Sequence, residues 1–252
     1  MEALSRRTLR DEVLLVLGVS LGVSGVYALL DLVRSLTAAK PLNQQTQTLI
    51  PSAAPGRPWL DLAFQLYSIG VGIVPALFAV HLMRRDHDNP AVTLGLTPTR
   101  PRFDLATGAG LAALIGIPGL GLYIAARAAD VNVTVVPAAL PHVWWQVPVL
   151  VLAAAQNAVL EEVVVVGYLL TRLRQLGWEM PVMIIASALL RGSYHLYQGF
   201  GGFLGNAAMG VVFALFFVRW RRVGPLVLAH AILDTAAFVG YALFAKHIWF
   251  LH

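Results

Sequence analysis

The sequence predicts an all-α membrane protein, a polytopic transmembrane helical bundle of about seven spans, with an eighth not excluded. Of its 252 residues, 58% are hydrophobic and 12% are charged, compared with roughly 25% charged residues in soluble domains. The mean hydropathy is +0.72. Several separate runs approach or exceed the roughly 18 to 20 apolar residues that cross a bilayer as a helix. They lack the alternating pattern of a membrane β-barrel.

The first apolar run covers residues 13–36. It is long for the apolar region of a signal peptide and has no convincing small-residue cleavage site, so we predict an uncleaved helix. Residues 41–58 are polar and rich in proline, which predicts an exposed loop. The second and third runs cover residues 60–83 and 105–126.

Four further runs complete the bundle. They cover residues 146–170, residues 181–197, a segment that follows the glycines of 199–205 and ends at Trp220, and residues 225–244. The glycine-rich segment at 199–205 is compatible with a re-entrant loop, which enters and leaves the membrane on the same side. We divide the chain into an N-terminal transmembrane scaffold at residues 1–145 and a helical core at residues 146–252.

The arginine clusters predict the orientation in the membrane. With seven spans they all fall on one side, while the opposite loops carry Lys40, Arg57 and Arg127; the clusters are Arg6/Arg7/Arg10, Arg84/Arg85/Arg100/Arg102, Arg172/Arg174 and Arg219/Arg221/Arg222. Basic loops stay in the cytoplasm, so we expect a multi-pass protein with its N-terminus inside. The composition is typical of a GC-rich bacterium, which indicates the bacterial cytoplasmic membrane.

Composition also limits the partners and the chemistry. The chain has no cysteine, which excludes disulfides, thiolate metal ligands and a cysteine nucleophile. Its net charge of +5 would suggest nucleic acid in a soluble protein. Here the basic residues lie beside apolar runs and suit a lipid bilayer, so we expect no nucleic-acid partner. The oligomeric state stays open.

Ionisable residues inside the late spans mark the candidate site. They are Glu161, Glu162, Arg191, His195, His230 and Asp234. Such residues cost about 2.5 to 3.5 kcal/mol each at mid-bilayer and usually pair inside the bundle. Arg191 and His195 are four residues apart and share a helix face, and so do His230 and Asp234.

The two glutamates are adjacent, so they diverge by about 100° around a helix. We expect one to face a cavity open towards the cytoplasm and the other to brace a neighbouring helix. Carboxylates and histidines together suit the activation of a water molecule. Purely structural pairing and ion transport use the same residue types and stay open. Tyr194 and Tyr197 are expected to be interfacial anchors.

At these residues the sequence resembles the CAAX protease and bacteriocin-processing family of intramembrane proteases, also called the Abi family. That family carries Glu-Glu-x-x-x-Arg, Phe-x-x-x-His and His-x-x-x-Asn/Asp in three spans, in that order. The matching stretches here are EEVVVVGYLL, RGSYH and HAILD. The resemblance covers residues 146–245 and implies a membrane endopeptidase acting on peptide or lipid-anchored protein substrates.

The resemblance also implies roles for the site residues. Glu161 is the base that activates water, assisted by His195, and Glu162 is a supporting carboxylate. His230 and Asp234 match the pair that stabilises the oxyanion. Metal dependence stays open, because the site could work without metal or hold zinc through Glu161, Glu162, His195 and His230.

Two positions depart from the family pattern. Val166 stands where the family has arginine, and Arg191 stands where it has phenylalanine. We interpret this as a compensating exchange in which Arg191 supplies the supporting charge to Glu161 or Glu162. The departures leave a catalytically inactive membrane scaffold or adaptor as an alternative, with a transporter as a further one.

Overall fold

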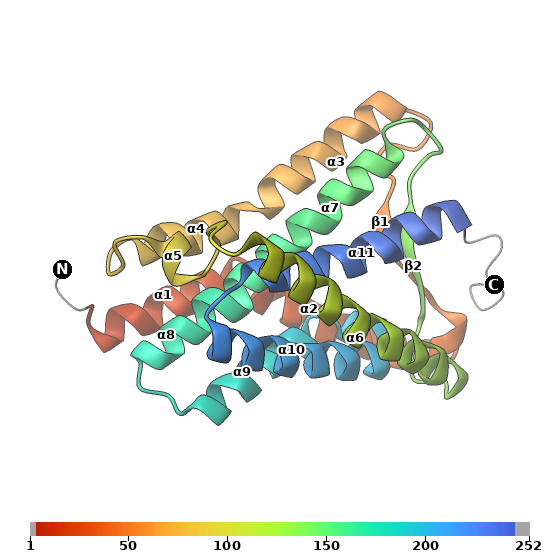
Figure 1. Cartoon of the computed structure of the whole chain (residues 1–252). Coiled ribbons are helices and arrows are strands. Elements are labelled where there is room, and N and C mark those ends of the chain that lie inside the picture. Colours follow the sequence, from red (N-terminus) through yellow and green to blue (C-terminus); the bar gives the residue numbers. More distant parts are fainter. Residues whose placement is uncertain (1–3, 245–252) are drawn as a thin grey trace.

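The structure, a computed structural model, describes residues 4–244 and is a bundle of long helices (Figure 1). The predicted all-α membrane bundle is therefore confirmed. The elements in chain order are α1 (Arg6–Gly18), α2 (Leu21–Leu36), η1 (Leu42–Gln44), β1 (Thr46–Pro51), α3 (Pro58–Gly72), α4 (Val74–Met83), α5 (Pro90–Thr93), α6 (Pro101–Ala128), β2 (Thr134–Ala139), α7 (Gln146–Glu161), η2 (Glu162–Tyr168), α8 (Leu169–Gln175), α9 (Met180–Ser193), η3 (Leu196–Gln198), α10 (Phe200–Trp220) and α11 (Gly224–Phe244).

The number of candidate spans is roughly consistent with the predicted seven: five, or six with one bent pair, among the described residues. Helices long and apolar enough to cross a membrane lie at Pro58–Met83, Pro101–Ala128, Gln146–Gln175, Phe200–Trp220 and Gly224–Phe244. α1 and α2 pass the same test together but are bent by 48°. The bend follows Gly18, and the hydroxyl of Ser20 donates to the carbonyl of Val16, so glycine and serine lie at the break, as is common for kinks. The remaining predicted run, residues 181–197, overlaps α9, an apolar helix that is shorter than a full span.

The strands β1 and β2 form a two-stranded parallel sheet that was not predicted. It lies across one end of the helices, which we call the sheet end (Figure 1). Both strands contain a proline, which weakens a strand prediction. The run VNVTVV at 131–136 nevertheless has the β-branched composition of a strand, and the sequence analysis missed this signal. The predicted loop at 41–58 therefore contains one short strand.

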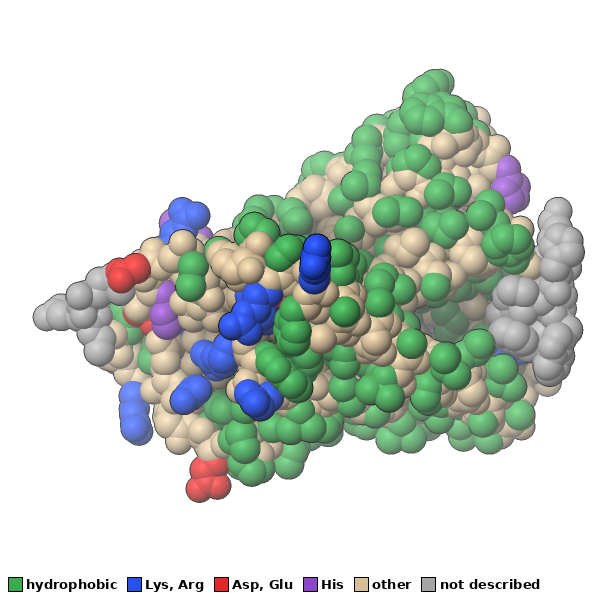
Figure 2. All heavy atoms as spheres, in the orientation of Figure 1, with side chains coloured by type: hydrophobic (Ala, Val, Ile, Leu, Met, Phe, Trp, Pro, Cys, Tyr) green, Lys and Arg blue, Asp and Glu red, His purple; other side chains and the backbone are tan. Residues whose placement is uncertain are grey.

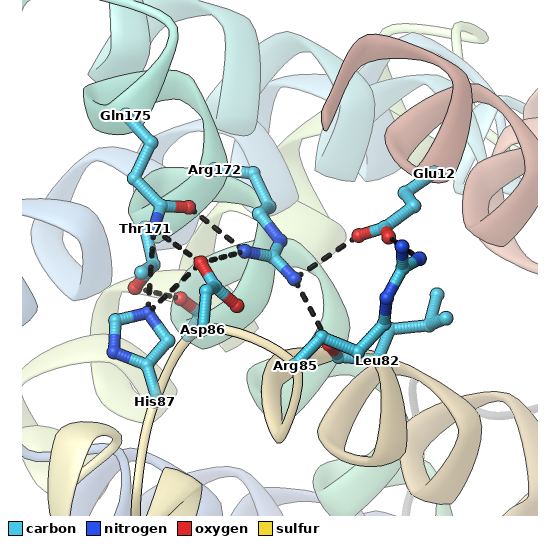
Figure 3. A network of polar contacts seen from close by, with 9 residues as sticks. Glu12, Leu82, Arg85, Asp86, His87, Thr171, Arg172 and Gln175 are labelled. Carbon is cyan, nitrogen blue, oxygen red and sulfur yellow. Dashed lines mark hydrogen bonds and ion pairs between the residues drawn. The ribbon is translucent and has the colours of Figure 1, made fainter. Parts of the chain in front are cut away.

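Buried ion pairs close the opposite end, which we call the arginine end (Figure 3). Arg172 is fully buried; it donates to Asp86 at 2.6 Å and to Glu12 at 3.0 Å. Arg85 pairs with the same Glu12. Because a buried charge without a partner is strongly destabilising, this cluster fixes α1 and the end of α4 against α8.

A second ion pair joins α6 to the connection between α10 and α11. Arg222 donates to both carboxylate oxygens of Asp104, at 2.7 and 2.5 Å, and to the carbonyl of Thr97 at 2.8 Å. The hydrogen bond to Asp104 raises the pKa of Arg222 above its ordinary value. The guanidinium is therefore always charged, and the pair anchors α11 at the arginine end.

Candidate active site

The helix that carries the paired glutamates changes its winding at Glu162. α7 ends at Glu161, and η2 is a π-helix. It contains four consecutive valines, whose β-branched side chains weaken the α conformation. The hydroxyl of Ser187 donates to the carbonyl of Val165 at 2.9 Å and so supports the altered backbone. Short π segments within α-helices are frequent at functional sites.

Glu162 joins three helices. It is fully buried, and its Oε1 accepts from Nη2 of Arg191 at 2.5 Å and from Nδ1 of His230 at 2.7 Å. Because a carboxylate oxygen accepts, Nδ1 of His230 carries a hydrogen in this contact. Arg191 belongs to α9 and His230 to α11, so this one oxygen connects η2 to both helices.

Glu161 is held on one side only. It is 8% exposed, and its Oε2 accepts from the hydroxyl of Tyr194 at 2.8 Å. Nη1 of Arg191 lies 3.6 Å from the same oxygen. No hydrogen bond from the described residues is made to Oε1 of Glu161, so that oxygen can accept from a water molecule.

Arg191 pairs with both glutamates, as the compensating exchange predicted. It is fully buried, and so is Val166 in the π-helix. The guanidinium also lies 5.4 Å from the ring centre of Phe213. Arg191 therefore makes the contact with the acids that the exchange requires, and compensation for Val166 stays a prediction.

The two glutamates contact different neighbours, Glu162 with Arg191 and His230 and Glu161 with Tyr194, yet their carboxyl groups lie close together. Ligand atoms of Glu161, Glu162 and His230 all lie within 4.8 Å of one another. The divergence of about 100° expected for adjacent helical residues therefore does not separate the two carboxyl groups. Both carboxylates consequently belong to one cluster.

Tyr194 is a site residue that the sequence analysis missed. It was expected to be an interfacial anchor, but it is only 5% exposed and its hydroxyl bonds to Glu161. Its position directly before His195, three residues after Arg191, was the available signal. Tyr197 differs, because its hydroxyl accepts from the side chain of Gln198.

His195 lies beyond the C-terminal end of α9 and not inside the span. Its Nδ1 is 3.0 Å from the carbonyl of Arg191. A carbonyl can only accept, so Nδ1 carries the hydrogen and Nε2 is left as an acceptor. The ring stacks obliquely on Tyr194 at 4.8 Å, but the structure shows no hydrogen bond between His195 and either glutamate.

Asp234 lies beside His230, as their spacing predicted. Its Oδ1 is 3.6 Å from Nε2 of His230. Both residues line a cavity of about 910 Å³ between α6, α10 and α11, and His195 and Asn206 line it too. The imidazoles and Asp234 thus face the cavity, whereas the two glutamates lie behind this wall.

The cavity lies towards the sheet end, since Val135 and Pro137 of β2 contribute to its wall. The expectation that it opens on the side of the arginine clusters is therefore wrong. The buried ion pairs of Arg172 and Arg222 fill the arginine end. The sequence did not predict that these pairs are buried, because the two residues of each pair lie far apart along the chain.

Part of the predicted metal set is assembled. Glu161, Glu162 and His230 have suitable ligand atoms within 4.8 Å, and carboxylate and imidazole suit zinc. His195 is not in this group. The Arg191 guanidinium is already 2.5 Å from Glu162, so a cation would bind next to a fixed positive charge. The donor types fit a metal, and the charge of Arg191 opposes it.

Comparison with known proteins supports the motif pattern. Residues 143–236 match the family model described as type II CAAX prenyl endopeptidase Rce1-like. No curated protein and no solved structure matches the chain. The matched range runs from the residues before α7 into α11 and contains all six ionisable residues of the predicted site. The resemblance is therefore confirmed over residues 143–236, which are similar to the Rce1-like CAAX endopeptidases.

Proposed function

We propose that this protein is an intramembrane endopeptidase that hydrolyses a peptide bond in membrane-associated proteins or peptides, using a water molecule activated by Glu161. One observation carries the proposal. Oxygen Oε2 of Glu161 is held by Tyr194, while Oε1 has no partner among the described residues. A general base needs such an oxygen within hydrogen-bond reach of the proton it removes.

In the proposed reaction, Glu161 takes a proton from water as the water oxygen bonds to the substrate carbonyl carbon. The carbonyl oxygen then carries the negative charge. His230 lies between the acids Glu162 and Asp234, and in its protonated form both ring nitrogens carry a hydrogen. In that form Nε2, in the cavity wall, can donate a hydrogen bond to this oxyanion. When the C–N bond breaks, the amine leaving group takes a proton from Glu161, and His195 orients that amine through Nε2.

Glu162 and Arg191 position these groups. Glu162 holds His230 through Nδ1, which directs Nε2 of that ring towards Asp234. Arg191 offsets the negative charge of the two neighbouring carboxylates. Without it, two like charges would be buried side by side with no fixed opposite charge beside them, which is strongly destabilising.

We propose that hydrolysis requires no bound metal. A zinc ion held by Glu161, Glu162 and His230 would polarise the attacking water, but Arg191 already supplies positive charge at the two acids. Cleavage by the purified protein should survive treatment with a strong chelator. Inactivation by the chelator followed by recovery with zinc would contradict this part of the proposal.

Glu161→Gln tests the function directly. The amide keeps the shape of the side chain but cannot take a proton, so cleavage of a membrane-anchored reporter peptide should be abolished while insertion and melting temperature stay near those of the parent. Glu179→Gln, at an exposed position, is the matched control and should cleave normally. Undiminished cleavage by Glu161→Gln would exclude this residue as the base.

A non-catalytic membrane scaffold is the second candidate, because neither glutamate is part of the cavity wall. In that case the parent protein would cleave no substrate. The cellular phenotype would survive Glu161→Gln but not substitutions on the protein surface. A transporter would instead show ion-coupled flux in liposomes.

A further inference from the structure

The cavity is confined to one half of the bundle. From α6 it is lined by residues of 114–123, in the second half of that helix. From α10 it takes residues of 201–212, in the first half. α10 begins at the sheet end, where Phe200 donates to the carbonyl of Val131. From α11 the cavity takes residues of 230–244, towards the C-terminal end of that helix. The walls from these three helices therefore lie mainly in the half of the molecule nearest β1 and β2.

The basic residues mark the other end. Figure 2 shows Lys and Arg side chains gathered towards the end that holds the N-terminus, whereas the visible surface towards the other end is mainly hydrophobic. Arg172 and Arg222 are bound into that end by their carboxylate partners. Basic loops near membrane spans remain in the cytoplasm. The arginine end is therefore assigned to the cytoplasm and the sheet end to the opposite side.

Tryptophans support two membrane interfaces at these ends. Trp59 and Trp144 are 68% and 74% exposed and pack edge to face, with ring centres 6.3 Å apart; they lie at the starts of α3 and α7, near the sheet. Trp178 and Trp220 are exposed at the arginine end. Tryptophan gathers at both surfaces of a bilayer, so the cavity lies close to the non-cytoplasmic interface.

The cavity wall also indicates what it holds. Leu114, Leu122, Leu233 and Ala237 are among its many apolar residues, and Asp234 is its acidic residue. A volume of about 910 Å³ lies at the upper end of the roughly 300 to 1,000 Å³ range of ligand sites. Such a wall suits an uncharged, apolar segment of several residues or an apolar chain attached to it.

We propose that substrate enters this site from the non-cytoplasmic side of the membrane, as an apolar peptide segment presented at the outer surface of the bilayer. This rests on the proposed endopeptidase function and adds the direction of access. The cytoplasmic end is closed by the buried clusters of Arg172 and Arg222, while the catalytic imidazoles face the cavity near the sheet end. The substrates are then exported or outward-facing segments.

The chain has no cysteine, so a thiol-reactive label on a single introduced cysteine shows from which side of the membrane that one position can be reached. Ala237→Cys places a thiol in the cavity wall. Ala139→Cys marks the exposed end of β2, and Asp88→Cys marks an exposed position at the arginine end. A charged, membrane-impermeant maleimide is added to intact cells and, separately, to inverted membrane vesicles.

Ala237→Cys and Ala139→Cys should react in intact cells, and Asp88→Cys only in inverted vesicles. Prior modification of Ala237→Cys from outside should also block reporter cleavage, whereas modification of Asp88→Cys should not. The proposal is overturned if Ala237→Cys is protected in intact cells but reacts in denatured protein, or if the two end markers label from the reverse sides.

Labelling does not depend on hydrolysis. The same three cysteines in a Glu161→Gln background should label from the same sides. The proposed direction of access can thus be refuted while cleavage still depends on Glu161. The proposed endopeptidase function can likewise be refuted while the labelling pattern is as expected. The two proposals are separately testable.

Discussion

At the scale of single residues, the hydroxyl of Tyr194 sets the position of the proposed base. It donates to Glu161 at 2.8 Å in a buried environment, and a hydrogen bond to a charged group contributes about 1.5 to 3 kcal/mol. We expect Tyr194→Phe to lower kcat about 10- to 100-fold with little change in KM, because Glu161 loses its only hydrogen-bond donor among the described side chains.

The control for Tyr194→Phe is Tyr197→Phe. Tyr197 follows three residues later, and its hydroxyl contacts Gln198 and neither glutamate. Steady-state cleavage of the reporter peptide should therefore be near normal in this variant. If both phenylalanine variants lose kcat equally, the hydroxyl of Tyr194 has no special role in positioning Glu161.

The exchange between positions 166 and 191 predicts a rescue. Arg191→Phe leaves two buried carboxylates without their cation, which should destabilise the protein by about 3 to 5 kcal/mol. Val166→Arg added to that variant restores the arrangement that the family pattern carries and should recover a large part of the loss. Thermal unfolding of the four proteins of this double-mutant cycle measures the coupling. A double variant as unstable as the sum of its parts would show that the two positions are independent.

At the scale of elements, the ion-pair cluster of Figure 3 holds the helix that bears the glutamates. Arg172 is fully buried between Glu12 and Asp86. Arg172→Met should destabilise the fold by about 3 to 5 kcal/mol. Arg85 contacts the same Glu12 from a half-exposed position. Arg85→Met should therefore lower the free energy of unfolding by only about 1 kcal/mol or less. Unfolding in detergent compares the two, and equal effects would rule out a special contribution from the buried pair.

Elements differ in how well the sequence predicts them. Long apolar runs identify the spans because burial in lipid demands a helix, and the motif order brings Glu162, Arg191 and His230 into contact as expected. The π-helix was not predictable, whereas the strand pair and the Tyr194 contact left only partial signals, in the run VNVTVV and in the position of Tyr194 beside His195. Each depends on contacts between distant segments, such as Ser187 with Val165, which local propensity does not encode.

At the scale of the whole molecule, the division of the chain at residue 145 stays a prediction. The last residues of the second part, 245–252, lie outside the described part of the chain. The contacts show how closely the two parts depend on each other. Glu12 and Asp86 bind Arg172, Asp104 binds Arg222, and α6 lines the cavity. The residues before 146 therefore form part of the structure around the site.

This dependence predicts the behaviour of a split protein. Residues 146–252 alone would leave Arg172 and Arg222 without their carboxylates and would remove the α6 wall of the cavity. Unpaired buried charges are strongly destabilising, so this fragment should be degraded or inactive. A break between β2 and α7 with both fragments co-expressed should restore reporter cleavage, because the interface can still form. Cleavage by residues 146–252 alone at the parent rate would show instead that the first 145 residues are dispensable for the site.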